Sequence, residues 1–362
     1  MKRREFLRAA AAGLAASAIA APAIAQSTPE LKWRLTASWP KSLDTLYGMC
    51  EDFAKNVAES TDNKFQIQVF AAGEIVPGLQ VLDAVQNGTV EIGSTAGYYY
   101  WGKDPSFAFA TAIPFGLNAR QQDAWQLRGG GMELLDGLFA DFGCYGLPMG
   151  NTGSQMGGWF RKEINTLDDL NGLKFRIGGF AGHVIKRLGV VPQQIAPGDL
   201  YPALEKGTID AVEWIGPYDD EKLGFSKIAK YYYYPGWWEG GANGHLLINR
   251  AKWESLSKTY QTIVTTSARE AGLRTTAKYD IVNSPAMKRL ITAGTQLRAF
   301  SPEIMEASFK AANETYAELA KTNARFKRIL ESIMAYREDS YSWWQVAELS
   351  FDLFQVRMLG RS

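Results

Sequence analysis

The feature that most constrains the fold is an alternation of short strand-like and helix-like patterns near the start of the chain. In a strand pattern polar and apolar residues alternate, whereas in a helix pattern apolar residues recur every three or four positions. The two patterns follow one another at residues 31–39, 43–60, 65–70, 79–86 and 90–94. Strands separated by single helices pair in parallel, because each helix returns the chain to the start of the next strand. The order therefore predicts an α/β lobe with a mostly parallel sheet.

A helical stretch at 119–142 completes this lobe, and the same alternation beyond Gly150 predicts a second lobe. Its strand patterns lie at 156–161, 173–177, 190–195 and 209–215, and its helix patterns lie at 181–188 and 200–206. Asp199 is expected to cap the helix at 200–206. The run Asp219-Asp220-Glu221 has the composition of a solvated helix start, where acidic residues favour the helix dipole.

The rest of the chain returns to the first lobe and then crosses both. It turns back near Glu239, and 245–249 is expected to join the first sheet as a strand. A helical pattern from Trp253 to about Ala293 is weakened only at Gly272 and Pro285. Because this pattern is longer than one lobe, it predicts a spine helix that lies across both lobes.

These patterns predict two lobes, each a mixed sheet flanked by helices, with a spine helix and a helical C-terminus. A last strand is expected at 295–300, and Ser301-Pro302 begins the helices that fill the remainder. The predicted boundaries are 26–150 plus about 240–270 for lobe I, 151–239 plus about 271–335 for lobe II, and 336–362 for a C-terminal helix. Two lobes linked by several crossings are typical of hinged proteins that close around a ligand.

Residues 1–25 have the composition of an export signal rather than of a folded segment. Basic residues around Arg3-Arg4 precede an alanine-rich run, and Ala23-Ile24-Ala25 matches a cleavage site. Phe6-Leu7 after the arginine pair favours the twin-arginine route, with general secretion as the alternative, and both routes lead to the bacterial periplasm. Removing four basic residues and one acidic residue changes the net charge from +1 to −2. This near-neutral charge argues against a nucleic-acid partner.

The sequence carries no recognisable catalytic motif. It has no G-x-S-x-G, H-E-x-x-H or P-loop pattern, and its two histidines, His183 and His245, are isolated. Cys50 and Cys144 lie far apart and are expected to be two separate buried thiols, with a disulfide between them as the alternative. We therefore do not expect the chain to be an enzyme.

An arginine inside an apolar strand indicates a site for a carboxylate. Arg176 lies in the glycine-bounded run 172–178, which is typical of a buried strand. Its guanidinium stays charged there and needs a carboxylate partner, which is either an acidic residue of this chain or a ligand. The aromatic run 98–101 follows the strand at 90–94, where ligands of α/β sheets gather. These rings are expected either to line a cleft or to pack in a loop.

The sequence around Arg176 resembles the extracytoplasmic solute receptors of TRAP transporters, the tripartite carriers of organic acids. The matching tracts are Asp169-Leu170-Asn171-Gly172-Leu173-Lys174-Phe175-Arg176, 201–210, 213–224 and 231–239. The last two tracts are similar to the branch of the family that binds 2-oxo acids. The resemblance extends over essentially the whole mature chain and implies a two-lobed periplasmic binding protein fold. Asp199 and Ala211 depart from the family pattern and affect only local loop geometry.

The resemblance implies specific contacts to a ligand and a cation. Arg176 would pair with the ligand carboxylate, as a bidentate guanidinium can. Gln155, the Trp214 carbonyl and Glu239 would coordinate a cation, and Glu213 would be either a further cation ligand or the partner of Arg176. Further contacts to the acid are expected from Gln155, Glu239, Asn151, Tyr99 and Tyr100.

The implied function is a periplasmic receptor that captures small, pyruvate-like 2-oxo monocarboxylates with a cation and delivers them to the membrane permease subunits. The charges of Arg176, Glu239 and the acid sum to −1, so Na+ is the expected cation. Ca2+ becomes the better choice if Glu213 also points inward. The alternatives are a receptor for 2-hydroxy acids, dicarboxylates or sugars, and a secreted metal-assisted enzyme.

The C-terminal helix is expected to mediate a homodimer. Six apolar positions fall on one broad helical face, namely Trp343, Trp344, Ala347, Phe351, Phe354 and Met358. The alternative is that this face packs on its own chain. The 2-oxo acid branch exchanges such a helix between protomers, so the resemblance favours the dimer.

Overall fold

The computed structural model describes residues 30–360, so the predicted export signal lies outside the described residues. The strands are β1 (Leu31–Ala37), β2 (Phe65–Phe70), β3 (Ile92–Thr95), β4 (Cys144–Asn151), β5 (Gly158–Phe160), β6 (Lys174–Arg176), β7 (Val191–Gln193), β8 (Ala211–Val212), β9 (Tyr231–Tyr234), β10 (Asn243–Asn249) and β11 (Gln296–Ala299). The helices are α2 (Leu46–Glu59), α3 (Val81–Gln86), α4 (Ala108–Thr111), α5 (Ala119–Arg128), α6 (Gly131–Asp141), α7 (Gly179–Ile185), α8 (Leu200–Glu205), α9 (Pro217–Leu223), α10 (Arg250–Ser255), α11 (Lys258–Thr292), α12 (Pro302–Thr322), α13 (Ala324–Trp344) and α14 (Glu348–Leu359). Among these residues, no helix combines the length and apolar character needed to span a bilayer.

The first sheet has the strand order β2-β1-β3-β10-β4 and is mixed. β1 and β3 pair in parallel, as the strand–helix–strand order predicts. β10 is antiparallel to both β3 and β4, so the sheet is mixed as predicted, although β1, β3 and β4 run in the same direction. β10 is antiparallel because it arrives from the second sheet without a crossover helix of its own, and no βαβ unit fixes its direction.

The second sheet has the order β11-β9-β5-β8-β6-β7 and is also mixed, as predicted. β6 pairs in parallel with β7 and β8, whereas β5 is antiparallel to β8 and β9. The four tyrosines of β9 show no polar–apolar alternation, which is why the pattern analysis does not identify this strand. Both Tyr232 and Tyr233 are buried, because the two faces of the sheet are covered. The division of the chain into two lobes stays a prediction, although the strands of each sheet fall mainly in the expected ranges.

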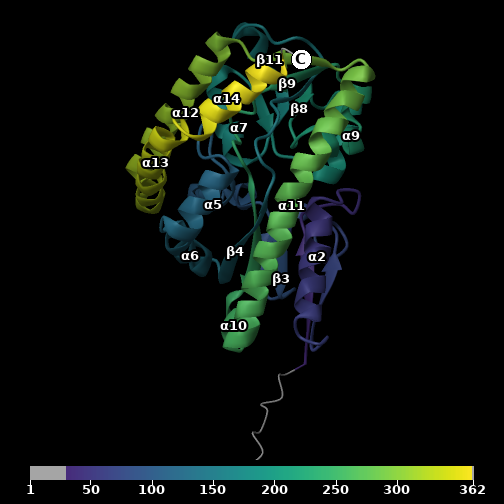
Figure 1. Cartoon of the computed structure of the whole chain (residues 1–362), viewed down its shortest axis with the longest axis vertical. Coiled ribbons are helices and arrows are strands. Elements are labelled where there is room, and N and C mark those ends of the chain that lie inside the picture. The colour runs from purple at the N-terminus through teal and green to yellow at the C-terminus, as the bar shows by residue number, and fades with distance from the viewer. Residues whose placement is uncertain (1–29, 361–362) are drawn as a thin grey trace, which may run out of the picture. The chain divides into compact units, whose positions relative to one another are not determined.

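The long helix α11 packs against β4 and α2 of the first half of the fold and against α9 of the second (Figure 1). The predicted spine helix is therefore confirmed, with a later start, because Leu256 and Ser257 separate it from α10. The Ser257 hydroxyl caps the first turn of α11 by accepting a hydrogen bond from the Tyr260 nitrogen at 3.2 Å. Pro285 lies inside α11 and does not end it.

Gly272 permits a close approach between α11 and the end of β4. A Cβ atom at Gly272 would stand 2.4 Å from the Gly150 nitrogen and 3.0 Å from the Gly150 Cα. These are backbone atoms, so they cannot yield as the end of a flexible side chain would. The glycine that weakens the helical pattern in the sequence thus marks a contact between helix and strand.

We expect Gly272→Ala to lower the free energy of unfolding by about 1–3 kcal/mol, because it overpacks this contact. Gly137→Ala is the matched control. Gly137 is also inside a helix, but a Cβ there meets no atom within 4 Å, so alanine should stabilise α6 by up to about 1 kcal/mol. Urea unfolding of both variants measures the difference. Equal changes in the free energy of unfolding of the two variants would contradict the claim that a side chain at position 272 overpacks the contact with Gly150.

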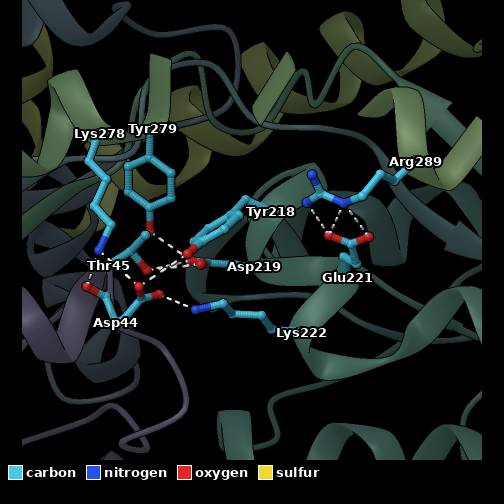
Figure 2. A network of polar contacts seen from close by, with 9 residues as sticks. All are labelled: Asp44, Thr45, Tyr218, Asp219, Glu221, Lys222, Lys278, Tyr279 and Arg289. Atoms are coloured by element: carbon cyan, nitrogen blue, oxygen red, sulfur yellow. Dashed lines mark hydrogen bonds and ion pairs between the residues drawn. The ribbon is translucent and has the colours of Figure 1, made fainter. Parts of the chain in front are cut away.

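The acidic run of α9 is buried, so the prediction of a solvated helix start is wrong for two of its three residues. Asp219 and Asp220 are fully buried, and burial raises the pKa of Asp219 to about 6 and that of Asp220 to about 7. Asp219 accepts hydrogen bonds from the hydroxyls of Thr45 at 2.8 Å and Tyr279 at 2.7 Å. Asp219, in the first turn of α9, lies between Thr45, which directly precedes α2, and Tyr279 of α11 (Figure 2).

Charged groups at the rim of this contact complete the network in Figure 2. Asp44 pairs with Lys222 of α9 and with Lys278 of α11. Glu221, which is partly exposed, pairs with Arg289 at 2.5 Å. Exposed ion pairs of this kind contribute little stability. The buried hydrogen bonds of Asp219 are therefore the main polar interactions that hold α9 in place.

Three local predictions have a clear outcome. Cys50 and Cys144 are free, buried thiols, as expected. Ser301 caps α12, as expected, by accepting a hydrogen bond from the Ile304 nitrogen. Asp199 occupies the position before α8, but its side chain makes no capping hydrogen bond, so that part of the prediction is wrong.

Candidate functional site

Arg176 ends β6, which lies between β8 and the edge strand β7 of the second sheet, and 1% of its surface is exposed. The parallel register places Arg176 beside Val212 of β8, so the residue after that strand, Glu213, reaches the same sheet edge. The Nη1 atom of Arg176 donates to Glu213 Oε1 at 2.5 Å and to the Glu213 carbonyl at 2.6 Å. The sequence left open whether Arg176 pairs with an acidic residue of this chain or with a ligand. In the structure it pairs with an acidic residue, Glu213.

Glu213 is as buried as Arg176 and is held by the backbone as well. Its Oε1 also accepts a hydrogen bond from the Gly178 nitrogen at 2.7 Å. Burial raises the pKa of Glu213, and the Arg176 charge opposes the rise. Its Oε2 atom finds no hydrogen-bond partner among residues 30–360. Glu213 therefore pairs with Arg176 and still presents one oxygen to a neighbour.

Gln155 and Glu239 come from two loops that hydrogen-bond to each other. The Gln155 nitrogen donates to the Glu239 carbonyl at 3.1 Å, and the Gly236 nitrogen donates to the Gln155 carbonyl at 3.0 Å. The Gln155 Nε2 donates to the Thr152 hydroxyl at 3.1 Å, which turns Oε1 the other way. The two predicted cation ligands are thus brought together by backbone contacts that the sequence does not reveal.

Glu239 is 2% exposed and interacts electrostatically with both members of the Arg176–Glu213 pair. Burial and the charge of Glu213 raise the pKa of Glu239 well above its usual range, while Arg176 and a hydrogen bond from Tyr98 oppose the rise. Two carboxylates and one guanidinium therefore share a single buried site. This excess of negative charge is suited to a bound cation.

Trp214 forms one wall of the site. Its ring lies 5.2 Å from the Arg176 guanidinium carbon and 6.3 Å from the ring of Trp39. The residue is 4% exposed and directly follows Glu213. The Arg176 guanidinium therefore makes a cation–π contact with the Trp214 ring, which stabilises its positive charge in the buried position.

The three tyrosines after β3 have different environments. The Tyr100 hydroxyl lies 2.9 Å from the Thr95 hydroxyl and accepts a hydrogen bond from the Leu82 nitrogen at 3.1 Å, so it is engaged inside the first half of the fold. The charges of Arg176, Glu213 and Glu239 act on Tyr99, whose hydroxyl approaches Arg176 but has no partner at full hydrogen-bond geometry among residues 30–360. Tyr99 is therefore the better of the two ligand candidates.

Tyr98 and Asn151 complete the surroundings. Tyr98 was not singled out from the sequence, although it lies in the aromatic run, and its link to Glu239 depends on the fold. The Asn151 oxygen accepts from the Gly153 nitrogen at 2.9 Å, and its Nδ2 donates to Asn243 at 2.5 Å. Asn151 thus braces the turn that carries Gln155, and its contact with a ligand stays a prediction.

The predicted site residues share a set of buried polar atoms without hydrogen-bond partners among residues 30–360. They are Arg176 Nη2, Gln155 Oε1, Glu213 Oε2, Glu239 Oε2, the Tyr99 hydroxyl and Trp214 Nε1. Each such atom costs about 1–3 kcal/mol when nothing satisfies it. A concentration of this kind indicates a polar ligand, with donors for an anion and oxygen acceptors for a cation.

The donor set fits a hard cation. Within the described chain, no group of three or more His, Cys, Asp and Glu residues is placed to hold a metal ion. The candidate set instead combines two carboxylates with the Gln155 amide oxygen and a main-chain carbonyl. Oxygen donors alone suit Na+ or Ca2+ and disfavour zinc or copper.

Comparison with known proteins relates the chain to bacterial receptors. The family model of bacterial extracellular solute-binding proteins, family 7, matches residues 36–323. A monocarboxylate 2-oxoacid-binding periplasmic protein of Nostoc sp. is 49% identical over 360 residues, which cover 98% of this chain and 99% of the relative.

Two solved structures resemble the fold closely. A TRAP transporter solute binding protein from Bordetella bronchiseptica, a dimer with copurified calcium and picolinate, has a TM-score of 0.91 and 47% identity over 92% of this chain and 99% of its own. A TRAP periplasmic solute binding protein from Pseudoalteromonas atlantica, with bound sodium and pyruvate, has a TM-score of 0.87 and 38% identity over 89% of this chain and 98% of its own. The chain belongs to family 7 of the bacterial extracellular solute-binding proteins.

Proposed function

We propose that this protein is a periplasmic receptor that captures a small 2-oxo monocarboxylate together with a cation and delivers both to the permease of a TRAP transporter. The observation that carries the proposal is the set of unpaired buried atoms around Arg176. Arg176 Nη2 and the Tyr99 hydroxyl are donors for the carboxylate of the acid. The oxygens of Gln155, Glu213 and Glu239 are acceptors for the cation, together with the Trp214 carbonyl.

A 2-oxo acid suits this arrangement because its carboxylate and its 2-oxo oxygen can chelate one cation. A dicarboxylate would add another negative charge to a site that already holds two carboxylates. A neutral sugar would leave the free donors of Arg176 without an anionic partner. The name of the Nostoc relative and the pyruvate in the Pseudoalteromonas structure support the same class of ligand.

The position of Glu213 changes the expected cation. Arg176 contributes one positive charge, and Glu213, Glu239 and the acid contribute three negative charges, so the site and the acid sum to −2. A divalent ion cancels this charge, whereas Na+ leaves −1. Because Glu213 is buried in the site and interacts with Glu239, we favour Ca2+ over the Na+ expected from the sequence. The calcium in the Bordetella structure supports this choice.

Titration calorimetry of the purified protein tests the function. Pyruvate is titrated into protein in metal-free choline buffer, and then again with added Na+ or Ca2+. We expect measurable binding only with a cation and tighter binding with Ca2+. Equal affinity in all three buffers would remove the cation from the proposal. Lactate and succinate in the same assay identify a 2-hydroxy acid or dicarboxylate receptor, if either binds more tightly than pyruvate.

We also propose that the protein binds its ligand without turnover. The described site offers an ion pair and oxygen acceptors, with no nucleophile beside a base. Incubation of pyruvate with excess protein, followed by proton NMR, should return the acid unchanged. Formation of a product would instead support the hypothesis that the protein is an enzyme.

The exposed apolar surface of α14 supports a homodimer. α13 ends at Trp344 and α14 begins at Glu348, so residues 336–362 do not form one continuous helix as expected. α14 has no buried residue, and Phe351, Val356 and Leu359 are 62%, 69% and 73% exposed. This exposed apolar surface is wider than the single face predicted from the sequence. Monomeric proteins rarely expose a contiguous apolar surface of this kind. We propose that a second copy of the chain covers it.

We expect a dimeric mass for the wild-type protein in light scattering at micromolar concentration. Phe351→Asp combined with Phe354→Asp should give a monomer, because two charges would be buried in the interface. Ile281→Asp is the control, since Ile281 is 76% exposed on α11. A monomeric wild type, or a double variant that remains dimeric, contradicts the role of α14.

A further inference from the structure

The buried carboxylate of Asp220 holds the peptide group between Trp214 and Ile215. Asp220 Oδ1 accepts a hydrogen bond from the Ile215 nitrogen at 3.2 Å. The carbonyl of that same peptide group belongs to Trp214 and is one of the proposed cation ligands. A planar peptide group moves as a unit, so a contact at its N–H also orients its C=O.

Asp220 is itself fixed by two side chains of the second sheet. Its Oδ2 accepts hydrogen bonds from the Tyr232 hydroxyl at 2.6 Å and from Trp159 Nε1 at 3.0 Å. The two rings stack with their centroids 4.0 Å apart and an interplanar angle of 16°. All three residues are fully buried. The carboxylate therefore has one position, defined by β5 and β9.

The following residue is held from the other side. The Ile215 carbonyl accepts a hydrogen bond from the Met156 nitrogen at 2.9 Å. Met156 directly follows Gln155, another proposed cation ligand. The segment 214–215 is thus tied at one point to the loop of Gln155 and at another to Asp220, which leaves the Trp214 carbonyl little freedom to turn.

We infer that Asp220 is a positioning residue of the cation site, which acts through the Trp214–Ile215 peptide group. It orients the Trp214 carbonyl toward the cation, because its Oδ1 accepts the hydrogen bond from the Ile215 nitrogen of the same peptide group. The inference rests on the proposed function, because it needs a cation at the site. It adds a residue that does not touch the ligand.

Asp219 supplies a matched control on the same helix. It is as deeply buried as Asp220 and has two hydroxyl partners, Thr45 and Tyr279 (Figure 2). It has no contact with the 214–215 peptide among the interactions of residues 30–360. Asp219→Asn should therefore disturb the contacts of α9 with Thr45 and with Tyr279 of α11 without changing the Trp214 carbonyl.

Calorimetry and thermal unfolding of three proteins test the inference. Pyruvate and Ca2+ are titrated into wild type, Asp220→Asn and Asp219→Asn, and the melting temperature of each is measured without ligand. In Asp220→Asn the single amide oxygen is expected to accept from Trp159 and Tyr232, which places the NH2 group against the Ile215 N–H and removes that hydrogen bond. We expect Ca2+ affinity to fall about 10- to 100-fold in Asp220→Asn and to stay at the wild-type value in Asp219→Asn, even where both melting temperatures fall.

The outcomes separate this inference from the proposed function. If wild type binds neither Ca2+ nor pyruvate, the proposed function fails and this inference fails with it. If wild type binds and both variants keep wild-type Ca2+ affinity, only the positioning role is overturned. Equal losses in the two variants also overturn it, because they indicate a general effect of α9 packing.

A spectroscopic readout reports on the peptide group itself. The dipeptide Trp-Ile occurs once in the sequence, so labelling Trp carbonyls with 13C and Ile nitrogens with 15N gives one correlated signal. We expect Ca2+ to shift this signal in wild type, and the shift to shrink in Asp220→Asn. An unchanged shift in the variant contradicts the inference. If Asp220→Asn does not fold, Tyr232→Phe removes one hydrogen bond to Asp220 with little change of volume, and the same reduced shift is expected.

Discussion

Arg176→Ala is expected to weaken binding of the acid strongly and to destabilise the protein at the same time. Arg176 Nη2 is the charged donor proposed for the ligand carboxylate, and truncation of one partner of such a buried pair costs about 2–5 kcal/mol of binding free energy. Affinity for pyruvate should fall by about 30- to 4,000-fold. The same change leaves Glu213 buried without its cationic partner, which costs about 3–5 kcal/mol of stability.

Arg176→Ala combined with Glu213→Gln separates the two effects. The glutamine removes the unpaired charge, so the free energy of unfolding should recover most of the loss while pyruvate binding stays as weak as in Arg176→Ala. Arg176→Lys should also bind poorly, because an ammonium cannot contact Glu213 and a carboxylate in one plane as a guanidinium can. Calorimetry and urea unfolding measure the two quantities. Wild-type affinity in a folded Arg176→Ala protein would exclude the proposed role.

Glu239→Gln is expected to weaken cation binding and to stabilise the protein in the absence of ligand. The change lowers the negative charge of site and acid from −2 to −1, which suits a monovalent ion better than a divalent one. Ca2+ affinity should fall by about 100-fold or more, since loss of a ligand exceeds the 10- to 100-fold typical of supporting groups. The affinity for Na+ should fall less than the affinity for Ca2+, so the ratio of the two affinities should decrease.

The opposite change in stability follows from burial. Glu239 is buried beside Glu213, and both burial and that charge raise its pKa. An amide of the same shape removes the repulsion, so the melting temperature of the ligand-free protein should rise. Glu221→Gln serves as control, because Glu221 is partly exposed and pairs with Arg289 outside the site. A Glu239→Gln protein that keeps wild-type Ca2+ affinity would show that Glu239 is not a cation ligand.

The sequence by itself determined most of the local structure. The strand and helix patterns predicted β1, β2, β6, β7 and the long helix α11 near their observed positions, because polar–apolar periodicity reflects which face of an element is buried. The resemblance to TRAP receptors, carried by short motifs around Arg176 and Glu239, indicated the residues that now lie together in one buried site.

Other features were decided only by the tertiary structure. The direction of β10 depends on the path that the chain takes from the second sheet. In β9, Tyr232 and Tyr233 are buried on opposite faces of the sheet, whereas Tyr234 is exposed. The sequence predicted a solvated helix start at Asp219 and Asp220, because acidic residues usually remain exposed. They are buried because Thr45, Tyr279, Trp159 and Tyr232, which are distant in sequence, supply their hydrogen bonds.

The charge of the site was likewise fixed by the fold. The residues alone left the partner of Arg176 open, and the resemblance left Glu213 as either that partner or a cation ligand. The parallel register of β6 and β8 brings Glu213 to the guanidinium, and a hydrogen bond between distant loops joins Gln155 to Glu239, which interacts with that pair. A linear sequence records which charges are present, but their separation and burial decide which of them interact, and both depend on the packing of segments far apart in the chain.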